Sequence, residues 1–223
     1  MMATPGTAPP IHGGAPAGSA RMGLVLLHGR GGSAGDILEL GTALGLPDIA
    51  LVAPQAPGHS WWPTSFLAPT AQMAPFIERG IDAVDGAIAT LEDGGLPRDR
   101  IALAGFSQGG CLALEYAARR PGLAAAFGLS AGLIGTADAG DTPDAALYGF
   151  PPKVLDYAGR LGGMPVVITV HEQDPHIPLP RARDSARTFA AMGADVTFDV
   201  TPGAGHGITD AGVAALRSVL NVG

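Results

Sequence analysis

Cysteine, lysine and charged residues are all scarce in this sequence of 223 residues. Its single cysteine, Cys111, excludes an internal disulfide and any metal site built from several thiolates, and it favours a reducing, cytoplasmic setting. Only 15% of the residues are charged, and the formal net charge of -7 leaves no basic stripe for a phosphate backbone. We therefore expect no nucleic-acid partner.

Long apolar runs are also missing. No segment reaches about 18 uninterrupted apolar residues, the length that a membrane-spanning helix needs, so we expect no membrane association. The first twenty residues contain four prolines and four glycines but neither a charged residue nor an apolar run, and so they lack the pattern of a signal peptide. We predict a flexible tail over residues 1–20 and a single α/β domain over residues 21–223.

Short apolar segments that end in glycine-rich turns alternate with segments of helical periodicity from Met22 onward. This alternation is typical of a mostly parallel sheet with helices on both faces. The expected strands cover residues 22–27, 49–52, 101–106, 123–129, 165–170 and 195–200. The expected helices cover residues 36–44, 71–91, 108–119, 179–192 and 210–220. Between the fourth and fifth strands lies a connection of roughly thirty-five residues, and such long loops often cap an active site.

One turn has the pattern of a catalytic nucleophile. The segment Gly105-Phe106-Ser107-Gln108-Gly109 fits the G-x-S-x-G elbow, and it lies directly between an expected strand and an expected helix. Its glycines allow the tight turn that exposes the serine hydroxyl. Of the eight serines, only Ser107 has this pattern around it. We interpret Ser107 as a nucleophile; the alternative is a helix N-cap, a position that serine favours.

A serine nucleophile needs a histidine base, and the base needs an acid that orients it. After an elbow of this kind the two follow in the order acid, then histidine. Asp174 lies four residues beyond the fifth expected strand, and His206 lies in a Gly-Ala-Gly-His-Gly turn after the sixth. Of the six histidines, only His206 has the right order and setting. Glu172 and Asp199 are rival acids, and a solvent-exposed charge is the alternative role for Asp174.

The tetrahedral intermediate of such a reaction requires backbone N–H donors for its oxyanion. We assign these donors to Gln108, which follows the nucleophile, and to Arg30 in the glycine-rich turn 28–32. The Arg30 side chain either contacts a polar or carboxylate part of the substrate or pairs with an acidic residue. Of these two roles we favour the ion pair.

Taken together, the motifs resemble those of the phospholipase/carboxylesterase family of α/β-hydrolases, over nearly everything from Met22 onward. The resemblance rests on Leu26-Leu27-His28-Gly29, Ala53-Pro54-Gln55-Ala56, Ser60-Trp61-Trp62, residues 105–110, residues 171–178 and Gly205-His206-Gly207. It implies an α/β-hydrolase fold, a Ser-His-Asp triad and no cofactor. It also implies that the partner is a small ester and that homodimers are common.

Two positions depart from the pattern of that family. Arg30-Gly31-Gly32 stands where acyl-protein thioesterases usually have a leucine followed by Gly-Asp, and Glu172 stands where the family often has glycine. Both departures add charge near the mouth of the site. They argue against substrates with long lipid chains.

Apolar side chains are the expected walls of the substrate pocket. The candidates are Trp61, Trp62, Phe66, Leu133 and Ile177. A core role for at least one tryptophan, and plain packing for the long connection that carries Leu133, are the alternatives. Cys111 lies one helical turn after Ser107, and we expect it to be buried packing and not a second nucleophile.

The sequence therefore predicts a serine carboxylesterase that acts on short-chain or small aromatic esters, or on thioesters, through an acyl-enzyme intermediate. Hydrolysis of lactones or of carbon-carbon bonds in ring-cleavage products is the first alternative, because a triad alone does not separate these reactions. A non-catalytic ligand-binding protein on the same fold is the second. A broken triad would mark that second alternative, and none is visible.

Overall fold

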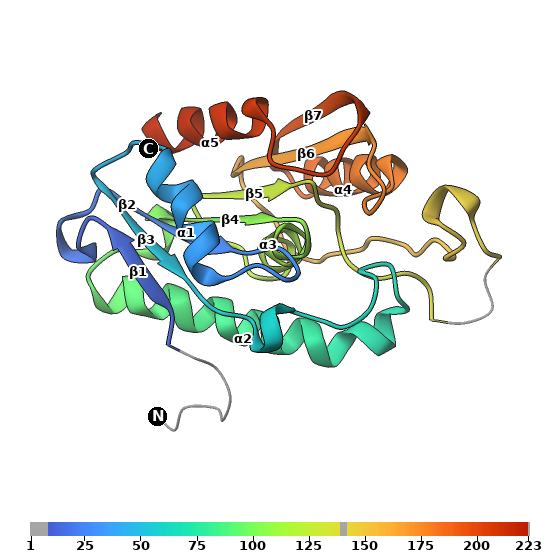
Figure 1. The fold of residues 1–223 in the computed structure, drawn as a ribbon, viewed down its shortest axis with the longest axis horizontal. Coiled ribbons are helices and arrows are strands. Elements are labelled where there is room, and N and C mark those ends of the chain that lie inside the picture. Colours follow the sequence, from blue (N-terminus) through green and yellow to red (C-terminus); the bar gives the residue numbers. More distant parts are fainter. Residues whose placement is uncertain (1–8, 139–141, 223) are drawn as a thin grey trace.

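Seven strands form one sheet in the computed structural model, which describes residues 9–138 and 142–222. The strands are β1 (Ile11–Gly14), β2 (Met22–Leu27), β3 (Ile49–Ala53), β4 (Ile101–Phe106), β5 (Ala125–Leu129), β6 (Pro165–Gln173) and β7 (Asp195–Ala204). Their spatial order is β1-β3-β2-β4-β5-β6-β7, and every neighbouring pair is parallel except β1 with β3 (Figure 1). The predicted, mostly parallel sheet is confirmed.

Helices cover both faces of this sheet, as predicted. They are α1 (Ala34–Ala43), α2 (Thr70–Asp93), α3 (Gln108–Arg119), α4 (Leu179–Ala191) and α5 (Asp210–Val222), with short 3-10 helices at Ala17–Ser19, Pro57–His59, Arg98–Arg100 and Ala145–Leu147. One core cluster joins the sheet to α2, α3 and α4, and a second joins its other face to α1 and α5 (Figure 1). The apolar stripe of α2 lies in the first cluster, which explains its helical periodicity.

Part of the predicted flexible tail is structured. The edge strand β1 pairs antiparallel with β3, with Ile11 opposite Ala53 and Gly14 opposite Ala50, and the 3-10 helix Ala17–Ser19 follows. The prediction of a tail therefore does not hold for these residues. Because β1 is largely exposed and contains two glycines, it lacks the apolar alternation from which a strand is predicted. Residues 1–8 lie outside the described part of the chain.

Strands β6 and β7 run further than the sequence predicts. Asp174 follows the end of β6 directly, and His206 lies two residues after the end of β7. Glu172 lies within β6 and not just beyond it. Since β4, β5, β6 and β7 are neighbours and parallel, the loops after β4, β6 and β7 meet at one edge of the sheet, where ligands of α/β proteins bind.

Candidate active site

The turn from β4 to α3 holds Ser107 at φ 53° and ψ -117°, a conformation that few residues other than glycine adopt. Two glycines are required beside it. A Cβ atom on Gly105 would lie 2.3 Å from the Gly109 carbonyl carbon, and one on Gly109 would lie 2.2 Å from the Leu27 carbonyl oxygen. The Ser107 side chain makes no capping hydrogen bond to α3. The structure therefore does not support the N-cap alternative.

Ser107, His206 and Asp174 form a continuous hydrogen-bonded chain. The Ser107 hydroxyl oxygen lies 2.8 Å from Nε2 of His206. Across the ring, Nδ1 lies 2.8 Å from Oδ2 and 3.0 Å from Oδ1 of Asp174. With its proton on Nδ1, the imidazole donates to the carboxylate and presents Nε2 as an acceptor for the hydroxyl. The structure thus brings together the three residues selected from their order in the sequence.

The Asp174 carboxyl is buried but held in its ionised form. Burial raises its pKa, and hydrogen bonds from His206, from the His176 amide (2.8 Å) and from the Ile177 amide (3.0 Å) lower it more strongly. The net pKa therefore lies below the ordinary value of 3.8. An ionised carboxylate is the form that stabilises a protonated histidine beside it.

The other acidic candidates lie elsewhere. Glu172 is exposed, and its carboxylate accepts a hydrogen bond from the Gly203 amide at 3.4 Å. Asp199 lies within β7, opposite Thr169 of β6. Asp174 itself is only 4% exposed, so the alternative of a solvent-exposed charge does not apply to it.

A cavity of about 490 Å³ opens beside Ser107. Trp62, Phe66 and Ile177 line it, in agreement with their selection as pocket walls. The remaining lining residues are Arg30, Ser65, Phe106, Gln108, Cys111, His176 and His206. The cavity is therefore mainly apolar, and the Ser107 hydroxyl and the His206 imidazole form part of its lining.

Trp61 and Leu133 do not line this cavity, and their prediction as pocket walls is wrong. The Trp61 ring is buried, and its indole N–H donates to the His28 carbonyl at 2.9 Å. Leu133 is fully buried in the core, and its amide donates to the Ser185 hydroxyl at 2.8 Å. Trp62, the next residue along the chain, lines the cavity, so the two adjacent tryptophans have different surroundings.

Arg30 and Gln108, whose amides are the predicted oxyanion donors, both lie at the cavity. Gln108 is the first residue of α3, where backbone N–H groups have no acceptor within the helix. The Arg30 guanidinium donates to the carbonyls of Pro63, at 3.0 Å, and Thr64. The predicted ion pair with an acidic residue is therefore wrong, because the loop after β3 folds back and supplies carbonyl oxygens in its place.

His176 is a residue of the site that the sequence analysis missed. Its ring meets the His206 ring edge-on, with centroids 4.8 Å apart and planes at 76°. Phe106 contacts His206 as well, with centroids 5.2 Å apart. These two rings restrict the rotation of the His206 imidazole. The available signal in the sequence was the position of His176, two residues after the candidate acid.

Cys111 lies in the wall of the cavity and is fully buried. Burial raises the pKa of its thiol to about 12. The thiolate is the nucleophilic form of cysteine, and this environment suppresses it. The expectation of buried packing is confirmed.

His28, from the motif at the end of β2, is buried and uncharged. Its Nδ1–H donates to the Gly29 carbonyl at 2.7 Å, and its Nε2 accepts from the Ala56 amide at 3.1 Å. Burial lowers the pKa of His28 from 6.5, and the Gly29 carbonyl, which raises it, compensates only in part. Protonation of this ring is therefore less favourable in the folded protein than in the unfolded chain.

We expect the free energy of unfolding to fall as the pH drops below about 6.5, because the unfolded chain then binds a proton at His28 that the native state does not. The contribution of His28 is fully present above the unfolded pKa and is lost as the pH falls below it. Urea unfolding at pH 8.0 and pH 5.5 checks this for the wild type and for His28→Gln. The variant should lose less stability between the two pH values, and an equal loss would contradict the assignment.

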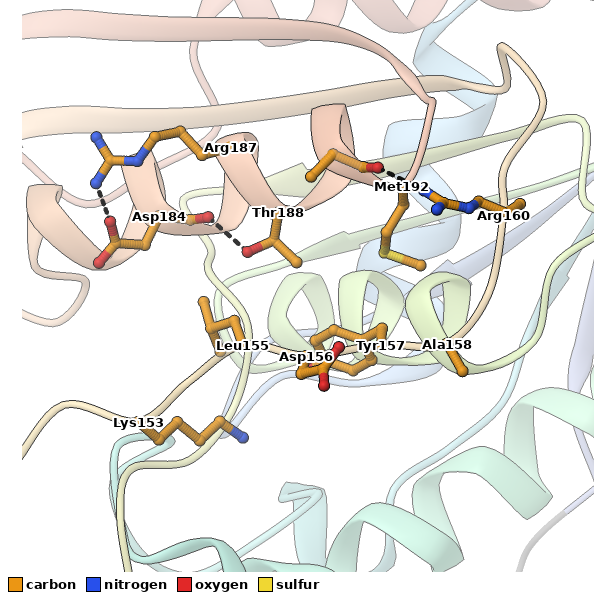
Figure 2. A pocket seen from close by; sticks show the side chains of 11 residues that line it. Lys153, Leu155, Asp156, Tyr157, Ala158, Arg160, Asp184, Arg187, Thr188 and Met192 are labelled. Carbon is orange, nitrogen blue, oxygen red and sulfur yellow. Dashed lines mark hydrogen bonds and ion pairs between the residues drawn. The ribbon is translucent and has the colours of Figure 1, made fainter.

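A larger cavity, of about 610 Å³, lies between α4 and residues 153–160 (Figure 2). Its lining contains no serine, histidine or cysteine. Arg187 pairs with Asp184, and the Thr188 hydroxyl donates to the Asp184 carbonyl at 2.8 Å. This cavity has neither a serine or cysteine nucleophile nor a histidine base in its lining, so the cavity beside Ser107 is the candidate active site.

Two further properties concern only residues 9–138 and 142–222. Within these ranges, no group of three or more His, Cys, Asp or Glu side chains is arranged to hold a metal ion. No helix in the same ranges is both long and apolar enough to cross a membrane.

Comparisons with known proteins agree with this architecture. The dienelactone hydrolase family matches residues 68–214, about two thirds of the chain. The crystal structure of a phospholipase/carboxylesterase from Dyadobacter fermentans DSM 18053 is 33% identical, with a TM-score of 0.83 over 99% of this chain and 100% of that one.

Two further crystal structures share the fold. Esterase PE8 is 24% identical, with a TM-score of 0.75 over 97% of this chain and 99% of that one. A carboxylesterase from Mesorhizobium loti is 20% identical, with a TM-score of 0.63 over 92% of this chain and 91% of that one. No curated protein sequence matches this chain significantly.

The sheet order, the elbow after β4 and the loops after β6 and β7 define an α/β-hydrolase fold. The chain belongs to the dienelactone hydrolase family, and its resemblance to phospholipase/carboxylesterases is confirmed by the Dyadobacter fermentans structure. At the level of the family, this is a hydrolase.

Proposed function

We propose that this protein is a serine carboxylesterase that hydrolyses short-chain or small aromatic esters through an acyl-enzyme intermediate. The observation that carries the proposal is the chain of hydrogen bonds from Asp174 through His206 to Ser107, with distances of 2.8 Å on both sides of the imidazole. Its hydroxyl end opens into a cavity of about 490 Å³. A hydroxyl, a base and an orienting acid in this order form the constellation of nucleophilic acyl transfer.

In the acylation step, Nε2 of His206 takes the hydroxyl proton while Oγ of Ser107 bonds to the ester carbonyl carbon. The carbonyl oxygen becomes an oxyanion, and the amides of Arg30 and Gln108 hold it by hydrogen bonds. When this intermediate collapses, the bond to the alcohol oxygen breaks. The alcohol takes the proton from His206 and leaves.

Deacylation repeats the same steps with water. His206 removes a proton from the water as its oxygen attacks the acyl carbon, and then returns the proton to Oγ of Ser107 as the acid product leaves. The ionised Asp174 stabilises the imidazolium that forms in both halves, and its hydrogen bond with Nδ1 keeps Nε2 directed at the hydroxyl.

The walls of the cavity favour a small substrate. Trp62, Phe66 and Ile177 offer apolar surface to an acyl or aromatic group, and small-molecule sites usually measure about 300–1,000 Å³. Arg30 is exposed and brings a positive charge to the lining. A cation in the lining is unfavourable for a long lipid chain, which favours short acyl groups.

We expect p-nitrophenyl butyrate to have a kcat/KM at least about tenfold above that of p-nitrophenyl laurate, since misfit of apolar groups costs roughly tenfold or more in specificity. Initial rates below the solubility limit of the laurate ester check this. The thioester S-phenyl thiobutyrate, measured beside phenyl butyrate, tests the leaving group separately. A preference for laurate would show that the proposed acyl size is wrong.

A lactone hydrolase is the second candidate, because the matching family is named for dienelactone hydrolysis. Dihydrocoumarin and phenyl propionate form a suitable pair, since the first is the cyclic counterpart of the second. A higher kcat/KM for dihydrocoumarin would favour the lactone activity. A higher value for phenyl propionate would favour the esterase.

A further inference from the structure

Two loops around the candidate active site are joined by hydrogen bonds. The glycine loop (residues 28–32) follows β2, and the aromatic loop (residues 59–66) carries the cavity walls Trp62 and Phe66. The Gly31 amide donates to the His59 carbonyl at 2.7 Å, and the His59 ring donates to the Gly32 carbonyl at 2.8 Å. The Trp61 indole adds its bond to the His28 carbonyl at 2.9 Å.

Arg30 adds a long side-chain link between these loops. Its guanidinium donates to the Pro63 carbonyl, at 3.0 Å, and to the Thr64 carbonyl. The planar fork of a guanidinium suits two acceptors at once. The acceptors lie 33 and 34 residues away in the sequence. The far end of the side chain is therefore fixed to the aromatic loop.

The side chain of Gln108 also binds the aromatic loop. Its Oε1 accepts from the Trp61 amide at 2.8 Å, and its Nε2 donates to the Trp62 carbonyl at 2.7 Å. Gln108 is buried, with 6% exposure. Both residues proposed to hold the oxyanion through their amides thus also bind the aromatic loop through their side chains.

The backbone around Arg30 is rich in glycine, and one hydrogen bond lies within it, from the Gly32 amide to the Gly29 carbonyl at 3.1 Å. Its neighbours in the loop are Gly29, Gly31 and Gly32, and Gly31 has φ 80°. Glycines give a backbone more conformational freedom than other residues do, so a restraint from outside the loop helps to keep one direction of an N–H group in it. The anchored side chain of Arg30 supplies one.

We infer that the Arg30 guanidinium is a positioning group: by binding the Pro63 and Thr64 carbonyls, it holds the Arg30 amide toward the oxyanion and couples that direction to the aromatic wall of the cavity. This inference rests on the proposed esterase function. In this role the Arg30 side chain stabilises the transition state indirectly, because it fixes the direction of the backbone N–H of the same residue. The side chain itself does not contact the substrate.

The test compares Arg30→Met with a matched control, Arg217→Met. Arg217 also donates to two backbone carbonyls, of Leu44 at 2.9 Å and Ala43 at 2.8 Å, but it lies on α5, outside the cavity lining. Both variants therefore lose the same kind of hydrogen bond. Kinetics with p-nitrophenyl acetate, whose acyl group is too short to fill the cavity, report on the oxyanion.

In Arg30→Met we expect kcat to fall by about tenfold or more with KM nearly unchanged, since small displacements of catalytic groups have effects of this order. The affinity for phenylboronic acid, which forms a tetrahedral adduct with a serine nucleophile, should weaken by a similar factor. Arg217→Met should retain both values. Arg30→Lys, whose ammonium cannot span both carbonyls in one plane, should be intermediate and provides the measurement should the methionine variant not fold.

Unchanged kcat and boronic acid affinity in folded Arg30 variants would overturn the inference, and so would a rise in KM alone, which would assign Arg30 to direct substrate contact. A different result is expected if the proposed esterase function itself is wrong. In that case the wild type itself would neither hydrolyse the ester nor bind the boronic acid.

Discussion

Replacement of Ser107 by alanine is expected to lower kcat for p-nitrophenyl butyrate by roughly 10⁴-fold or more, because it removes the hydroxyl that is paired with the His206 base. Cys111, the thiol in the wall of the same cavity, is buried, and burial raises its pKa to about 12. The substitution removes one oxygen atom, and the alanine adopts the same backbone φ and ψ angles as Ser107. The free energy of unfolding should therefore stay within about 1 kcal/mol of the wild-type value.

Ser218→Ala is the matched control for this substitution. Ser218 is an exposed residue of α5 and does not line the cavity, so this variant should keep full activity. Steady-state rates and urea unfolding of both variants provide the comparison. Retained turnover in Ser107→Ala would remove the basis of the proposed mechanism.

Replacement of Gly109 by alanine should prevent the elbow from forming. The new Cβ atom would lie 2.2 Å from the Leu27 carbonyl oxygen and 2.5 Å from the His28 carbonyl oxygen. Both contacts are with backbone, which cannot move without separating α3 from β2. We expect the free energy of unfolding to fall by about 3 kcal/mol or more, with loss of activity in whatever protein remains folded.

Gly86→Ala is the corresponding control. Gly86 is an exposed residue inside α2, and a Cβ there meets nothing within 4 Å. Alanine is the better helix former, so this variant should gain about 0.5–1 kcal/mol. Urea unfolding of both variants measures the contrast. A Gly109→Ala protein as stable as the wild type would mean that the close approach of α3 to β2 is not what the elbow requires.

Much of the fold and the hydrogen-bonded chain of the site follows from local patterns. The run from Ile101 to Phe106 is apolar throughout because both faces of β4 are covered, and the glycines around Ser107 mark a turn that few other residues permit. Asp174 and His206 each follow a strand of the sheet. In a parallel sheet such positions share one edge, so order along the chain predicts proximity.

The interactions that shape the cavity are not local, and the sequence does not predict them. Trp61 and Trp62 are adjacent and of one type, yet only tertiary contacts decide that the first binds the His28 carbonyl and the second faces the cavity. The partners of Arg30 are backbone carbonyls, which every residue possesses. No pattern of side chains identifies them in advance.

Mass spectrometry after reaction with a fluorophosphonate tests the identity of the nucleophile most directly. The reagent reacts preferentially with a serine that a neighbouring base activates, with loss of fluoride. We predict that the folded wild type gains one phosphonyl group, that the modified peptide carries it on Ser107, and that Ser107→Ala gains none. Labelling of another residue, or no labelling of the folded wild type, would contradict the assignment of Ser107 as the nucleophile.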